Sequence, residues 1–86
     1  MSVRIEVTYE MAKELGTPRF EVEAATVADA VAAARERFAG SSADFDELAR
    51  RAAVAVNGVL VRHRERLGTK LADGDTLTFV KAAAGG

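Results

Sequence analysis

The residues with the clearest potential for chemistry are the last two of the sequence, Gly85 and Gly86. They follow a turn and an apolar run within residues 71–80, the pattern of a final strand in a small domain. Glycines have no Cβ atom, so a Gly-Gly end can enter a narrow channel and adopt any φ that the channel requires. The residues before it are also small: Ala82, Ala83 and Ala84. This order indicates a domain whose reactive group is its own C-terminal carboxylate.

Length and composition exclude several classes of function. The chain has 86 residues, a net charge of −1 and no cysteine. One domain is expected, without disulfides, thiolate metal sites or a cysteine nucleophile. Acidic and basic residues are interspersed, which argues against a nucleic-acid binder. No apolar run approaches membrane-spanning length and the N-terminus lacks a signal-peptide core, so we expect a cytoplasmic protein that contacts no membrane.

Other polar residues are better explained by structure than by catalysis. His63 has no second histidine or cysteine to complete a site, so we expect no bound metal. Asp73 and Asp75 flank Gly74, which is typical of a tight turn rather than a metal loop. A group of basic residues favours a solvated face and, if it docks a partner, would steer an acidic surface: Arg62, Arg64, Arg66 and Lys70.

The first part of the chain has the pattern of a hairpin. Residues 3–9 and 19–23 alternate apolar and polar side chains with the period of a strand. Residues 10–15 between them suit one or two helical turns, stopped by Gly16 and Pro18. We therefore expect an antiparallel pair of strands with a long connection.

The main helix is expected to begin after Thr26, with Asp29 completing a variant of the capping box. Gly40 is a suitable left-handed stop. The apolar residues of the helix recur with helical spacing and form one stripe that should face the core: Val27, Ala30, Val31, Ala34 and Phe38.

The second half of the chain predicts a short helix within residues 44–51, with a buried pair: Phe45 and Leu48. Strands are expected at residues 53–56 and 59–61, joined by Asn57-Gly58, the strongest short-range hairpin signal. The last strand, residues 76–80, should place Leu77 and Phe79 in the core. One helix on a mixed sheet of four or five strands is an α+β fold, and a parallel pairing of the first and last strands would make it a β-grasp.

Together these features resemble the ubiquitin-like sulfur-carrier proteins of the ThiS/MoaD type, which include the thiamine sulfur carrier and the small subunit of molybdopterin synthase. The resemblance rests on the β-grasp order, on Val56-Asn57-Gly58, on Leu71-Ala72-Asp73-Gly74-Asp75 and on the terminal Gly85-Gly86. The length is nearer that of the molybdopterin subunit. Those subunits often carry proline just after the last strand, where this chain has Lys81-Ala82.

The resemblance implies a protein cosubstrate (a sulfur carrier) rather than an enzyme, one that can act as the small subunit of a synthase complex. A separate, ubiquitin-activating-like enzyme would use ATP and Mg²⁺ to adenylate the carboxylate of Gly86. A thiocarboxylate would follow and donate sulfur to an acceptor such as the large subunit of molybdopterin synthase. Because the chain has no P-loop, we expect it to bind no cofactor itself. The β-grasp domain should span residues 1–80, and a flexible tail residues 81–86.

Ordering the tail costs entropy, so the folded face must supply much of the affinity for a partner. We expect partner contacts near the root of the tail: Leu60, Arg62, Arg64, Phe79, Val80 and Lys81. Three alternatives stay open. The chain could carry sulfur for thiamine, cysteine or secondary-metabolite synthesis. It could modify proteins through isopeptide bonds to lysine, or be a binding domain whose Gly-Gly end is incidental.

Overall fold

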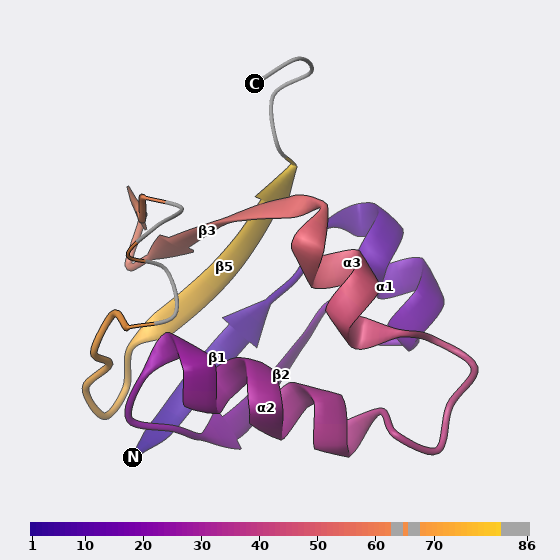
Figure 1. The fold of residues 1–86 in the computed structure, drawn as a ribbon, viewed down its shortest axis with the longest axis horizontal. Coiled ribbons are helices and arrows are strands. Elements are labelled where there is room, and N and C mark those ends of the chain that lie inside the picture. The colour runs from indigo at the N-terminus through magenta and orange to yellow at the C-terminus, as the bar shows by residue number, and fades with distance from the viewer. Residues whose placement is uncertain (63–64, 66–67, 82–86) are drawn as a thin grey trace.

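The computed structural model of the chain describes residues 1–62, 65 and 68–81 (Figure 1). Within these residues the helices and strands follow in this order: β1 Ser2–Glu6, α1 Tyr9–Leu15, β2 Arg19–Glu23, α2 Val27–Arg37, α3 Phe45–Arg50, β3 Ala52–Val56, β4 Val59–Leu60 and β5 Thr76–Lys81. The helix α2 lies across one face of the sheet, and α1 and α3 lie nearer the end of β5 (Figure 1). No helix in the described ranges is long and apolar enough to cross a membrane.

The sheet has the strand order β2-β1-β5-β3-β4. The strand β1 pairs antiparallel with β2 and parallel with β5, so the first and last strands lie side by side at the centre of the sheet. The strand β5 pairs antiparallel with β3 on its other side. This mixed sheet, packed on one main helix, confirms the predicted β-grasp fold.

Local hydrogen bonds explain where the first two helices begin. The Thr8 hydroxyl accepts from the Met11 N–H at 3.1 Å, and α1 ends at Gly16 with φ of 82°. The Thr26 hydroxyl accepts from the Asp29 N–H at 3.1 Å, which confirms the predicted cap of α2. The Asp29 carboxylate accepts from Ala25 at 3.3 Å, one residue before the cap, so the capping box is offset by one position.

Two details of the predicted helices were wrong. The helix α2 ends at Arg37, and Phe38 closes it with an ordinary φ of −102°, so Gly40 is not a left-handed stop. The ring of Phe38 packs between those of Phe20 and Phe45, with centroid distances of 5.1 and 6.2 Å, and the chain leaves the helix at that ring. In α3 the buried pair is Phe45 and Ala49, because Leu48 borders a pocket and stays partly exposed.

A row of aromatic rings crosses the core. Phe38 meets Phe20 edge to face and stacks on Phe45, and Phe45 meets Phe79 edge to face at 5.7 Å. Such pairs contribute about 0.5–1.5 kcal/mol each beyond their buried area. The row joins the edge strand β2 to β5, so the strand that leads into the tail is anchored across the whole core.

Candidate functional site

The strand β5 leads directly to the proposed reactive end. Leu77 and Phe79 are 0% and 2% exposed and hold the strand in the core. The strand continues to Lys81, which pairs with Ala52 of β3, so Lys81 belongs to the sheet although the sequence assigned it to the tail. Residues 82–86, which include all the predicted tail glycines and alanines, lie outside the described residues.

An apolar patch lies on the sheet face that points away from α2. Directly paired residues of neighbouring strands share a face. Val80 pairs with Ala53, and Ala55 pairs with both Thr78 and Leu60, so these side chains line one face. Leu60 is 66% exposed. We call this set the sheet patch: Ala53, Ala55, Leu60 and Val80. Val80 and Leu60, the apolar residues that the sequence suggested for docking, thus share a face, but Leu60 is level with Thr78 and the strand β3 lies between it and β5.

The other predicted partner-binding residues have different positions. Phe79 lies on the core side of β5, and at 2% exposed it is not part of the sheet patch. Arg62 is exposed just after β4. Arg64 lies outside the described residues, as do His63 and Arg66. Lys70 is exposed and forms an isolated bridge with Thr26 through the backbone.

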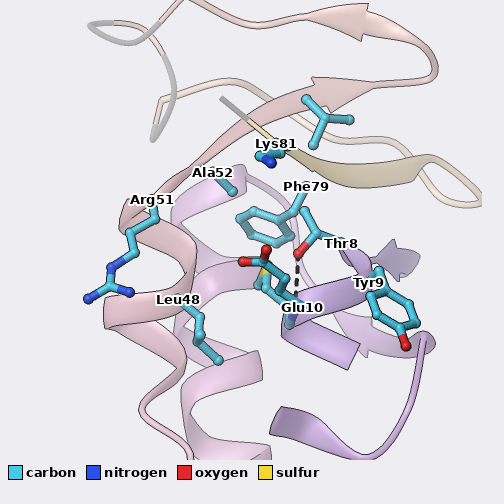
Figure 2. A pocket seen from close by; sticks show the side chains of 10 residues that line it. Thr8, Tyr9, Glu10, Leu48, Arg51, Ala52, Phe79 and Lys81 are labelled. Carbon is cyan, nitrogen blue, oxygen red and sulfur yellow. Dashed lines mark hydrogen bonds between the residues drawn. The ribbon is translucent and has the colours of Figure 1, made fainter. Parts of the chain in front are cut away.

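A pocket of about 470 Å³ lies beside the end of β5, between α1 and α3 (Figure 2). We call it the tail-root pocket, because Lys81 is part of its wall. Its apolar lining comes from four separate elements: Met11, Leu48, Ala52 and Phe79. Its polar rim includes Tyr9, Glu10 and Arg51. The sequence did not predict this pocket, since no local sequence pattern shows how α1, α3 and β5 pack together.

The rim of the tail-root pocket carries both charges. The Arg51 guanidinium is paired with Glu47, one turn earlier in the chain, at 3.0 Å. Glu10 and Lys81 form no ion pair with another residue in the described part of the chain. Tyr9 is 79% exposed, and the Lys13 ammonium lies 5.6 Å from the centroid of its ring. The rim therefore offers an exposed aromatic ring, one carboxylate and one ammonium to solvent.

The two turn motifs behind the resemblance bind each other. The Asn57 side chain accepts from the Thr76 N–H at 2.9 Å and donates to the Asp75 carboxylate at 2.9 Å. Asn57 and Gly58 have φ of 50° and 85°, which confirms the predicted hairpin turn. Bonds from the Ala72 N–H and from the Asn57 amide lower the pKa of Asp75 below its ordinary value. We call this arrangement the turn clamp, and it fixes the start of β5.

The aspartates of the second turn have structural partners. Asp73 accepts from the Ser2 N–H at 2.8 Å, and Asp75 accepts from the Ala72 N–H at 2.8 Å. Gly74 has φ of 86°, as a tight turn requires. Among residues 1–62, 65 and 68–81, no group of three or more His, Cys, Asp or Glu side chains is placed to hold a metal ion.

Comparison with known proteins places this geometry in a family. CysO in the BexX/CysO complex of Amycolatopsis orientalis has 27% identity, with 98% of this chain and 99% of that chain covered and a TM-score of 0.77. SAMP1 from Haloferax volcanii has 26% identity over 100% of both chains and a TM-score of 0.68. A chain from the complex of subunits 1 and 2 of the Helicobacter pylori molybdopterin-converting factor shares the fold, with 21% identity over 100% of both chains and a TM-score of 0.67.

A comparison with curated proteins found no match. The family comparison is specific, however, since residues 6–86 match the ThiS family. That match covers all of α1 to β5 and runs through the Gly85-Gly86 end. With its β-grasp sheet and its clamped turns, the chain belongs to the ThiS family of ubiquitin-like sulfur-carrier proteins.

Proposed function

We propose that this protein carries sulfur as a thiocarboxylate on Gly86, as a protein cosubstrate and not as an enzyme. The observation that carries the proposal is the ThiS match, which extends through Gly85-Gly86. The chain ends in small residues directly after an anchored central strand, β5. The predicted cytoplasmic location fits this function, because activation of the carboxylate consumes ATP.

The chemistry takes place at the C-terminal carboxylate in two steps. A carboxylate oxygen attacks the α-phosphorus of ATP, pyrophosphate leaves, and an acyl adenylate forms. A sulfur nucleophile then attacks the acyl carbon, the bond to the AMP oxygen breaks, and a C–S bond forms. We propose that a separate adenylating enzyme binds the ATP and Mg²⁺, and that this chain supplies the acyl group and the docking surface.

The sheet patch supports a docking role. Leu60 and Val80 lie on the face of the sheet that α2 leaves open, and Val80 is next to Lys81, the last residue of β5. Ordering a chain end on a partner costs conformational entropy, so the partner needs a folded surface beside that end. An exposed apolar group near the tail suits that need.

For the acceptor we propose a synthase of the molybdopterin type, with the large subunit as partner. A second candidate is favoured by one observation. The CysO chain of the BexX/CysO complex has the higher identity and TM-score, 27% and 0.77, against 21% and 0.67 for the molybdopterin-converting factor chain. A carrier of the CysO kind, working with a partner like BexX, is therefore the alternative acceptor system.

A protein modifier is the third possibility. The Haloferax volcanii protein with 25% identity is described as a small archaeal modifier protein. This role would join Gly86 to a lysine of another protein through an isopeptide bond. Its product, a covalent ladder that survives thiol treatment, separates it from a thiocarboxylate on the isolated chain.

The test is intact-mass spectrometry after incubation with a cognate adenylating enzyme, ATP, Mg²⁺ and a sulfur source. The wild type should gain the mass of one oxygen-to-sulfur exchange. Deleting Gly86, or adding one residue after it, should abolish the gain. One residue moves the chain end by up to ~3.6 Å, as far as the reacting atoms are apart, about 3–3.5 Å.

The matched control adds one glycine before Met1 instead, and it should react like the wild type. Circular dichroism should show the same fold for all four proteins. Reaction of the C-terminally extended chain at its new end, at the wild-type rate, would mean that the terminus is not recognised as proposed. A wild type that no adenylating enzyme modifies would favour the incidental Gly-Gly end. Adding each candidate acceptor in turn then identifies which one consumes the sulfur.

A further inference from the structure

We propose that the tail-root pocket receives a large apolar side chain of the adenylating enzyme while that enzyme holds the C-terminus. This inference rests on the proposed function and adds a second contact site to it. The sheet patch lies on one face of the sheet. The tail-root pocket opens beside α1 and α3 (Figure 2), with Phe79 from the core side of β5 in its lining and Val80 of the sheet patch at its border. A partner that surrounds the tail would contact both.

The position of the pocket is the first argument. Lys81 lines the pocket, and Gly86 comes five residues after it in the sequence. Extended chain spans at most about 3.3–3.6 Å per residue, so Gly86 can reach no further than about 18 Å from Lys81. An enzyme that binds the terminal carboxylate must therefore place protein surface near the pocket mouth.

The size and lining of the pocket are the second argument. A volume of about 470 Å³ lies within the range of ligand sites, roughly 300–1,000 Å³. Such sites are mostly apolar with a few polar groups that orient the ligand. Here Met11, Leu48 and Phe79 supply the apolar surface. A leucine, methionine or phenylalanine side chain matches that lining.

The exposed ring of Tyr9 is the third argument. Tyr9 lines the pocket and is 79% exposed, so it contributes little to the core. Tyrosine is enriched among the residues that dominate binding energy at protein interfaces. A ring at the rim can cover the inserted side chain and exclude water from it. The short helix α1 thus presents a docking residue as well as covering the core through Met11.

The charged side chains beside the pocket are the fourth argument, because they add specificity for the partner. Glu10 and Lys81 lie on opposite sides of the pocket with Phe79 between them (Figure 2). Neither forms an ion pair with another described residue, whereas Arg51 is already paired with Glu47. Complementary charges mainly set specificity and the rate of association. The inserted apolar residue should therefore be flanked by a basic group that faces Glu10 and an acidic group that faces Lys81.

Two other occupants fit the pocket less well. The chain's own tail contains only alanine and glycine after Lys81, so it has no large apolar side chain to fill the volume. A second copy would have to offer an exposed apolar group. Within the described residues the large exposed apolar groups are Met1, Tyr9, Val59 and Leu60. Val59 and Leu60 form the edge strand β4, and that strand contains no charged residue that could face Glu10 or Lys81.

The test uses two variants. Ala52→Met adds a larger side chain that fills the pocket from β3, and Tyr9→Ala removes the exposed aromatic ring at the rim. The control is Ala28→Met on the exposed side of α2. The measurement is ATP–pyrophosphate exchange by a cognate adenylating enzyme at varied carrier concentration. We expect both pocket variants to raise KM for the carrier at least about fivefold, a loss typical of an interface anchor, with kcat unchanged. The control should keep the wild-type KM.

The outcomes separate this inference from the proposed function. Wild-type KM in both Tyr9→Ala and a folded Ala52→Met would overturn the pocket proposal and leave the carrier function standing. Because Tyr9 is exposed, its replacement tests the proposal even where Ala52→Met unfolds the sheet. An inert wild type refutes the proposed function instead. Shifts of the Met11 and Leu48 methyl resonances on removal of residues 82–86 would identify the tail as occupant, and self-association lost in Tyr9→Ala would identify a second copy. Either result overturns the proposal.

Discussion

Asn57 joins the two turns at the start of β5, and its replacement should lower stability in two separable ways. Its side chain accepts a 2.9 Å hydrogen bond from the Thr76 N–H and donates one to Asp75. Its backbone has φ of 50°, a left-handed conformation that asparagine tolerates and alanine does not. Asn57→Gly removes the side-chain bonds but keeps the conformation accessible. Asn57→Ala removes the bonds and adds backbone strain.

The expected losses follow from these contacts. A net hydrogen bond contributes about 0.5–1.5 kcal/mol, so losing the bond to the Thr76 N–H should cost Asn57→Gly about 1 kcal/mol. Alanine in place of glycine at positive φ costs about 1 kcal/mol or more, so Asn57→Ala should lose about 2 kcal/mol. For a domain of this size each 1 kcal/mol lowers Tm by roughly 4–8 °C.

The assay is urea unfolding of the wild type and both variants at pH 7, followed by circular dichroism. A double-mutant cycle with Asp75→Ala adds a test of the turn clamp, since the loss from Asn57→Gly should shrink when Asp75 is already absent. A free energy of unfolding for Asn57→Gly within about 0.3 kcal/mol of the wild type would refute the hydrogen-bond argument. Equal losses in the two variants would refute the backbone argument.

Two further predictions concern stability. Phe38→Ala should cost about 2 kcal/mol, less than the 3–5 kcal/mol of a fully buried ring, because Phe38 is only partly buried. Phe45→Ala, at 3% exposed, should cost the full amount in the same urea titration, and equal losses would contradict this ranking. The pKa of Asp75 is lowered from its ordinary value of 3.8, so the stability that it contributes is present above about pH 4 and is lost as pH falls through the folded pKa. Urea midpoints measured from neutral to acidic pH should fall less steeply below pH 4 in Asp75→Asn than in the wild type, and parallel curves would show that Asp75 does not drive the loss.

Local signals in the sequence predicted the fold well. Thr26 caps α2, Asn57-Gly58 makes the hairpin, and Gly16 ends α1, because each depends on hydrogen bonds or φ angles within a few residues. The end of α2 was mispredicted at Gly40. That helix ends at Arg37, and the ring of Phe38, which follows it, is held between Phe20 of β2 and Phe45 of α3, contacts between separate elements that the local pattern does not show.

The candidate site was predictable only in part. Strand periodicity correctly predicted that Val80 lies on the opposite face from Leu77 and Phe79, but it could not predict that β3 separates Val80 from Leu60. The tail-root pocket was not predictable, since it needs the packing of α1 and α3 against β5. The bond between Asn57 and Asp75 was missed for a similar reason, as both residues had an adequate local explanation in their own turns.

The central place of β5 in the sheet has a consequence for how the protein is made. Residues 4–6 are synthesised long before residues 76–78, yet the two segments pair in parallel. Contacts this distant in sequence form slowly, because a long loop must close before they contribute. A chain cut short before β5 would leave β1 and β3 with unpaired edges, which invite aggregation. Completion of the sheet thus waits until residues 76–78 have been synthesised, and until then β1 and β3 lack the strand that joins them.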